Sequence, residues 1–395
     1  MTGVREMNDK IKNRLAKVLR DAVANQELSG GSIAVFKDGQ EQCFIGDGYA
    51  DLAAKQEIKR DTIFRLYSMS KPVTAVAAMI LMERGELSLQ APVSEYLPAF
   101  HNAKVHCQDH LEAVENPMTV YDLLNMTSGL TYGDEQSKTG RMTGKLLDET
   151  EARLLMEDAL TTQQLAEKVG EIPLLFQPGT SWEYGISADI LGAVIEKVAK
   201  QPFGEFLETE IFSLLEMADT GFYVPAEKYN RLAKAYQTEE DGSLQEYTGG
   251  FLAINNKMDR PARFESGGAG LVSTVDDYHK FAQMLLQKGS YGKHQILQSG
   301  TVEYLTNGQL ATGHQATFEH WSNQRGFSYG NMMKVLKYPE QAPGLGRVGE
   351  YGWAGWLGCN FVNCPNEQLT LLVMQQKKDS GQLVDKIRNV LFAGI

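Results

Sequence analysis

The chain has 395 residues, of which 43% are apolar and 22% charged, and its formal net charge is −12. Its length exceeds the about 250–300 residues at which single cores stop growing, so we expect two lobes in a globular protein. The negative charge and the lack of a lysine–arginine block argue against nucleic acid or anionic membrane as partners. No apolar stretch reaches the roughly 18–20 residues that span a bilayer. The first residues lead into a charged amphipathic helix, which predicts a cytoplasmic protein, or else a secreted one whose leader has been removed.

The cysteines and histidines predict neither a metal site nor a cofactor. The four cysteines match no zinc module in their spacing and none is paired as C-x-x-C: Cys43, Cys107, Cys359 and Cys364. A short polar segment gathers further candidate ligands: His101, His106, Cys107, Asp109 and His110. Because this segment is loop-like, we expect structural or exposed histidines there, not metal ligands.

The first part of the chain predicts a helix, a hairpin and a second helix. Residues 5–28 place apolar side chains at helical spacing among charged ones. Strands are predicted at 32–36 and 42–49, because Asp38-Gly39 between them is a hairpin turn signal. An apolar run follows Lys71 and ends near Gly85, which predicts a buried helix that begins at about Ser68.

The rest of the chain is predicted to be helical in the middle and strand-rich near its end. Helical patterns cover residues 120–126, 146–169, 190–199, 276–286 and 383–392, and strand-like runs cover 328–335, 356–362 and 368–374. This order predicts an α/β (α+β) fold, with an antiparallel sheet flanked by helices plus a helical domain. We expect a discontinuous sheet domain of residues 1–66 and 265–395, a mainly helical domain of residues 67–264, and an active site in the cleft between them.

Ser68 and Lys71 are the candidate nucleophile and base. Positions i and i+3 of a helix share one face, so this spacing places the hydroxyl and the amine side by side. A serine becomes a nucleophile when a base lies within hydrogen-bond reach, and a lysine in apolar surroundings can be that base. The Ser68 N–H, at the positive end of the helix, can help hold an oxyanion. The alternative for the tetrapeptide alone is a capping serine and a solvated lysine.

Three motifs, taken together, resemble the penicillin-recognising serine hydrolases. They are Ser68-Met69-Ser70-Lys71, Tyr184-Gly185-Ile186 and Trp353-Ala354-Gly355, supported by the segments 123–130 and 267–274. The resemblance covers roughly residues 10–392. It is to the class C-like branch, which contains class C β-lactamases, DD-peptidases, D-aminopeptidases and, most similar here, family VIII carboxylesterases. It implies a β-lactamase/DD-peptidase-like fold and no cofactor.

The resemblance also implies roles for residues outside the helix. Tyr184 would act with Lys71 in moving the proton of Ser68, and either residue could be the first base. The backbone N–H groups of Ser68 and Trp356 would form the oxyanion hole. Taken singly, Tyr184 and the two tryptophans could equally be packing residues.

Two departures from the family pattern predict the substrate. Ile186 stands where the family usually has asparagine, and Trp353 stands where it has lysine or histidine. A substrate carboxylate would lose a charge-assisted hydrogen bond of about 1.5–3 kcal/mol, which favours neutral, less polar acyl groups. The predicted substrate-binding residues are Trp353, Ala354, Gly355, Ile186, Tyr132 and Trp182.

The preferred prediction is therefore a serine hydrolase that cleaves small-molecule carboxylic esters through an acyl-enzyme on Ser68, with weak β-lactam hydrolysis. A class C-like β-lactamase or D-amino-acid peptidase shares the nucleophile, and an acyltransferase would pass the acyl group to an alcohol or amine. A non-catalytic binding or filament-forming module would need a broken nucleophile. An α/β-hydrolase is disfavoured because no G-x-S-x-G elbow is present. The sequence does not predict an oligomeric state.

Overall fold

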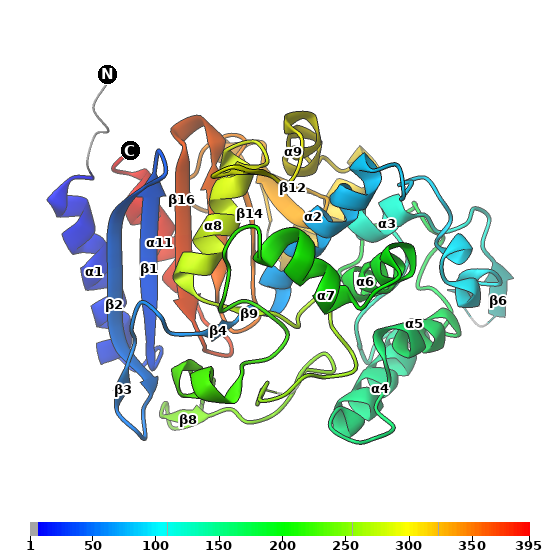
Figure 1. Ribbon diagram of the computed structural model, residues 1–395, viewed down its shortest axis with the longest axis horizontal. Helices are drawn as coiled ribbons and strands as arrows, with labels where there is room; N and C mark the ends of the chain where they lie inside the picture. Colours follow the sequence, from blue (N-terminus) through cyan, green and yellow to red (C-terminus); the bar gives the residue numbers. More distant parts are fainter. Residues whose placement is uncertain (1–6, 109, 255, 323) are drawn as a thin grey trace.

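The computed structural model describes every residue except 1–6, 109, 255 and 323. An eight-stranded antiparallel sheet organises it, with strands from both ends of the chain (Figure 1). In spatial order they are β12 (Phe327–Gly330), β13 (Met333–Leu336), β14 (Tyr351–Ala354), β15 (Asn360–Cys364), β16 (Leu369–Gln375), β1 (Gly30–Lys37), β2 (Gln40–Asp51) and β3 (Gln56–Glu57). The predicted α/β (α+β) architecture is therefore confirmed.

The predicted hairpin joins β1 and β2. Asp38 and Gly39 both have positive φ, 51° and 73°, as a two-residue turn that follows the sheet twist requires. Both faces of β1 are covered, because alternate residues enter different cores. Ile33 packs with the helices of the chain ends, whereas Ala34 belongs to the main core on the other side.

Helices from the two termini cover one face of the sheet (Figure 1). They are α1 (Asp9–Ala24) and α11 (Leu383–Phe392), whose apolar stripes meet the sheet in one cluster. The opposite face carries α8 (Val275–Leu286) and continues into the helical region. This second core surrounds the helix that carries the candidate nucleophile.

The middle of the chain is mainly helical. Its helices are α2 (Ser70–Glu83), α3 (Val120–Asn125), α4 (Lys138–Arg153), α5 (Thr162–Gly170), α6 (Ser187–Ala199) and α7 (Phe203–Leu207), and α9 (Ser299–Thr306) and α10 (Thr312–Ser322) follow α8. Four short ribbons complete the fold: β4 (Phe64–Arg65) with β9 (Val272–Ser273), β5 (Lys104–Cys107) with β6 (His110–Ala113), β7 (Tyr236–Thr238) with β8 (Leu244–Glu246), and β10 (Ser290–Tyr291) with β11 (His294–Gln295). Across the described residues, no helix combines the length and apolarity needed to cross a membrane.

Three predicted elements are divided in the structure. The helical pattern at 146–169 is split between α4 and α5. The run at 328–335 is a hairpin, β12–β13, because Asn331 and Met332 adopt positive φ values of 50° and 67°. The run at 356–362 is a turn followed by β15, and the Gly358 N–H donates to the Gly355 carbonyl at 2.9 Å within it. Tight turns explain the last two interruptions, which apolar patterning alone does not reveal.

Candidate active site

Ser68 lies in a 3₁₀ turn, Tyr67–Met69, that leads directly into α2. Tyr67 has φ of 46°, an uncommon value for a residue other than glycine. Its ring is wholly buried and its hydroxyl donates to Asn256 Oδ1 at 2.9 Å, so the surroundings hold this strained backbone. The next residue is thereby presented at the amino end of α2. Every α2 residue from Ser70 to Leu81 is buried, so the turn has a rigid base.

Lys71 is fully buried, and its Nζ reaches three oxygen acceptors. It donates to Ser68 Oγ at 3.1 Å, to the Tyr132 hydroxyl at 3.1 Å and to the Gly268 carbonyl at 2.9 Å. An ammonium has three donors, so these contacts saturate it and fix its position. The predicted pairing of hydroxyl and amine through i,i+3 spacing is present in the structure.

Asp189 supports the loop that holds Lys71. Its Oδ1 accepts from Ser266 Oγ at 2.5 Å and from the Gly268 N–H at 3.1 Å. Burial raises the pKa of this carboxyl, and the nearby Lys71 ammonium partly opposes that rise. A Cβ at position 268 would lie 2.6 Å from Asp189 Oδ2, so only glycine fits there. Asp189 belongs to none of the three motifs, and its one signal in the sequence is a carboxylate within the apolar run of α6.

Tyr184 packs against Lys71 through its ring. The Lys71 Nζ lies 4.7 Å from the ring centroid, and the hydroxyl oxygen of Tyr184 accepts a hydrogen bond from Trp353 Nε1 at 3.1 Å. In the described part of the chain, this hydroxyl makes no direct hydrogen bond to Ser68 or Lys71. Both Tyr184 and Ser68 nevertheless line one cavity.

Tyr132, expected only as a pocket residue, contacts the Lys71 ammonium directly. Burial raises the pKa of its phenol well above the ordinary range, and the negative charge of Asp189 raises it further. Tyr132 therefore stays protonated and can both accept from Lys71 and donate into the cavity. Its ring meets that of Tyr184 edge to face, with centroids 5.7 Å apart.

The turn after β14 brings Trp356 to the same cavity. Gly355 is necessary there, because a Cβ would lie 2.1 Å from the Leu66 carbonyl oxygen, just before the nucleophile turn. Within the described residues, no backbone hydrogen bond engages the N–H groups of Ser68 and Trp356. Both N–H groups are thus free of backbone partners, as oxyanion-hole donors would need to be.

The cavity around Ser68 has a volume of about 350 Å³ and aromatic walls. It is lined by Ser68, Tyr132, Tyr184, Phe251, Leu252, Trp321, Ser322, Gln324, Lys334, Trp353, Ala354, Gly355 and Trp356. Trp321 stacks on Trp353, and Phe251 stacks on Trp356 with centroids 4.4 Å apart. The site therefore offers flat apolar surfaces beside the nucleophile.

Two predicted substrate-binding residues lie behind this cavity instead of lining it. Trp182 is wholly buried among Phe318, Tyr329 and neighbouring rings, where it supports Tyr184. Ile186 is 1% exposed and begins α6, facing the core. Both residues were predicted to bind substrate because they lie near Tyr184 in the sequence. The chain changes direction after Tyr184 to enter α6, and both side chains are buried in the core.

The histidine-rich segment holds ordinary polar contacts. His106 Nδ1 lies 3.1 Å from Thr139 Oγ1, and His110 pairs with Glu112 at 2.7 Å. Asp109 lies outside the described residues. Among those that are described, no group of three or more histidine, cysteine, aspartate or glutamate side chains is arranged to hold a metal ion.

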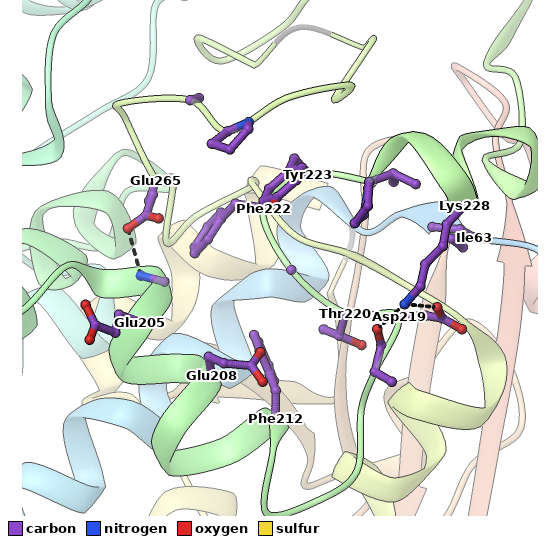
Figure 2. Close-up of a pocket in the computed structure, with 17 residues that line it drawn as sticks. Ile63, Glu205, Glu208, Phe212, Asp219, Thr220, Phe222, Tyr223, Lys228 and Glu265 are labelled. Carbon is purple, nitrogen blue, oxygen red and sulfur yellow. Dashed lines mark hydrogen bonds and ion pairs between the residues drawn. The ribbon is translucent and has the colours of Figure 1, made fainter.

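A second cavity, of about 380 Å³, shares no lining residue with the first (Figure 2). Carboxylates and aromatic rings line it, but Lys228 already pairs with Asp219 at 2.9 Å, and Glu265 accepts from the Gly204 N–H at 2.7 Å. Its described lining contains no serine or cysteine. The Ser68 cavity is therefore the candidate active site.

Known proteins place this arrangement in a family. The sequence model of the β-lactamase family matches residues 15–394. Esterase EstB of Burkholderia gladioli is 28% identical over 96% of this chain and 95% of its own. Protein Rv1367c of Mycobacterium tuberculosis is 29% identical over 90% of this chain and 87% of its own.

Solved structures agree on the fold. EstCE1, described as a hydrolase with promiscuous acyltransferase activity, superposes with a TM-score of 0.83 at 24% identity, over 97% of this chain and 99% of its own. A class C β-lactamase from Rhodobacter sphaeroides gives a TM-score of 0.67 at 18% identity, over 96% and 99% of the two chains. These structures confirm the predicted fold, and the sequence similarity to esterase EstB supports the predicted class C-like, esterase-containing branch. The chain belongs to the β-lactamase family of serine hydrolases.

Proposed function

We propose that this protein hydrolyses carboxylic esters through an acyl-enzyme on Ser68. The contact that carries the proposal is the 3.1 Å hydrogen bond between Lys71 Nζ and Ser68 Oγ, inside a cavity with aromatic walls. Ser68 Oγ attacks the ester carbonyl, and the N–H groups of Ser68 and Trp356 hold the resulting oxyanion. The intermediate collapses to the acyl-enzyme and releases the alcohol, and water then releases the acid.

Lys71 and Tyr184 move the proton in this scheme: either Lys71 as the neutral amine or Tyr184 as the phenolate accepts it from Ser68 Oγ. Lys71 is directly hydrogen-bonded to the nucleophile, and the Tyr184 ring lies against the ammonium. During acylation, the proton removed from Ser68 Oγ passes to the leaving alcohol. During deacylation, a proton is taken from the attacking water and passes to Ser68 Oγ as the acid leaves. Tyr132 and the Gly268 carbonyl hold Lys71 in place during both steps.

The cavity favours esters over β-lactams and peptides. Trp353 replaces the usual cation of the third motif and directs its indole N–H to Tyr184. Ile186 is buried and offers no amide to a substrate. Similarity to EstB, named as an esterase, supports the same choice. We expect weak β-lactam hydrolysis beside ester cleavage, because both reactions proceed through the same acyl-enzyme.

A substrate screen with two variants tests the proposal. The wild-type protein should hydrolyse p-nitrophenyl butyrate faster than a chromogenic cephalosporin or a D-alanyl peptide, and Ser68→Ala should reduce ester turnover to background. Ser70→Ala is the matched control, because its hydroxyl accepts from the Leu271 N–H and lies in the helix core. Formation of a new ester after an alcohol is added shows whether the acyl group is also transferred to that alcohol. Unchanged ester turnover in Ser68→Ala would refute the proposal.

A further inference from the structure

Lys334 is the charged side chain among the described residues that line the Ser68 cavity. It belongs to β13, and the strand register pairs it with Gly352 of β14. Cross-strand partners project to the same face of a sheet, so Lys334 shares a face with Gly352 and Ala354, opposite to Trp353. The cavity thus has a cation on β13, although position 353 of β14 holds a tryptophan.

The Lys334 ammonium has no carboxylate partner in the described part of the chain. Its Nζ donates to the neutral Gln324 Oε1 at 3.1 Å and lies 4.6 Å from the Phe327 ring centroid. The nearby Arg388 and Glu350 are already bonded to each other at 2.5 Å. A partly buried ammonium normally has an anionic partner, because the charge loses hydration there. Because Lys334 lines the cavity, a ligand bound there can supply that partner.

Lys334 also stands where the active-site cavity meets a larger one. The adjoining cavity has a volume of about 630 Å³ and shares with the first Ser322, Gln324, Lys334, Ala354 and Gly355. Lys334 and Ala354 therefore line both cavities, whereas Trp321 and Trp356 line the one that contains Ser68.

We propose that Lys334 binds a carboxylate carried by the substrate. This inference rests on the proposed ester hydrolysis and names its substrate class: esters with an apolar or aromatic body and a carboxylate remote from the scissile carbonyl. The expectation of neutral substrates considered only the loss of the cation at position 353. Lys334 provides charge recognition from a position that the three motifs do not include.

Two pairs of esters test this assignment and locate the carboxylate. On the acyl side, the mono-p-nitrophenyl ester of adipic acid is compared with p-nitrophenyl hexanoate. On the leaving-group side, 4-acetoxybenzoate is compared with its methyl ester. In at least one pair, Lys334→Met should lower the ratio of kcat/KM for the anionic over the neutral ester by about tenfold or more, mainly through KM.

Two further variants separate charge recognition from structural damage. Lys334→Arg should largely preserve the ratio, because it keeps the positive charge. Lys337→Met is the matched control, since Lys337 lies just beyond β13 and bonds to Asn307 instead of lining the cavity. A ratio altered by less than about twofold in both pairs by Lys334→Met overturns the inference.

A binding measurement keeps this inference distinct from the proposed function. Ser68→Ala cannot form the acyl-enzyme, so calorimetry can follow the binding of both anionic esters without turnover. Adding Lys334→Met should weaken the binding of at least one of them about tenfold or more. Lys334-dependent binding without any ester turnover by the wild type would overturn the proposed function alone. Ester turnover with both the ratios and the binding independent of Lys334 would overturn the inference alone.

Discussion

The indole N–H of Trp353 donates a hydrogen bond to the hydroxyl oxygen of Tyr184 at 3.1 Å. Both side chains line the cavity that contains Ser68, and the Tyr184 ring lies against the Lys71 ammonium. A neutral donor at this position orients the phenol oxygen without adding a second positive charge beside Lys71. Trp353 is thus a positioning residue for Tyr184, and its loss should affect catalysis more than binding.

Replacing Trp353 by phenylalanine tests that role. The variant keeps an aromatic ring and removes the donor, so we expect kcat to fall about tenfold, the effect of one hydrogen bond, with a small change in KM. Trp321→Phe is the comparison, because Trp321 packs on the Tyr184 ring with centroids 4.5 Å apart. That variant should change KM more than kcat. The reverse pattern would contradict the assigned role of Trp353.

Tyr132→Phe should lower kcat by roughly 10- to 100-fold, because Lys71 loses one of three acceptors and its position relaxes. Tyr184→Phe should cause a larger loss, within about 10²–10⁴-fold, since it removes a proton-transfer group. Steady-state kinetics with one p-nitrophenyl ester and circular dichroism of each variant provide the comparison. An unaffected kcat in Tyr132→Phe would show that Ser68 and Gly268 suffice to place Lys71.

The carboxylate discrimination assigned to Lys334 should depend on pH. Burial, together with the nearby Arg388, lowers the pKa of this ammonium to about 8, although Glu350 and Asp385 oppose the shift. The ammonium is charged below that pH, so kcat/KM for an anionic ester relative to its neutral partner should be highest there and fall above it. The ratio in Lys334→Arg should stay flat to higher pH. A wild-type ratio that rises through pH 8 would contradict the assignment.

His279 predicts how stability changes with pH away from the site. Its ring stacks on Phe36 with centroids 3.4 Å apart, and its buried Nδ1 has no hydrogen-bond partner among the residues that the structure describes. Burial lowers its pKa from 6.5 to about 4. The unfolded chain therefore binds a proton more readily, and the free energy of unfolding falls as pH drops from about 6.5 to 4, by about 3 kcal/mol in total.

Denaturant melts across this pH range provide the measurement. His279→Phe should have a smaller loss of stability on acidification than the wild type. His101→Phe, at an exposed position, should follow the wild-type slope. Equal pH slopes in the wild type and His279→Phe would show that other groups dominate acid destabilisation.

Local spacing predicted the contact between Ser68 and Lys71, whereas contacts between distant segments were harder to predict. Ser68 and Lys71 lie one helical turn apart, so geometry follows from sequence once the helix is recognised. The Gly268 carbonyl accepts from Lys71, and Asp189 of α6 holds Gly268 in place. Both contacts depend on a loop that packs against α6. Lys334 lines the cavity because β13 pairs with β14, and the position of β13 depends on the turn at Asn331 and Met332. Such pairings are long-range, and no short motif encodes them.

The pocket residues show the same distinction. Trp353 begins the third motif, on β14, and Trp356 comes directly after that motif. Both line the cavity. Trp182 and Ile186 were chosen because they neighbour Tyr184 in sequence, yet the start of α6 turns both into the core. Sequence proximity to a site residue therefore predicted location poorly where the chain changes direction.

Trapping the acyl-enzyme shows whether Ser68 is the residue that carries the acyl group. The wild-type protein is mixed with p-nitrophenyl acetate, quenched in acid during the initial burst, and analysed by intact and peptide mass spectrometry. We expect one acetyl group per chain, attached to Ser68, and none in Ser68→Ala. An acetyl group on another residue during the burst, or a burst of equal size from Ser68→Ala, would contradict it.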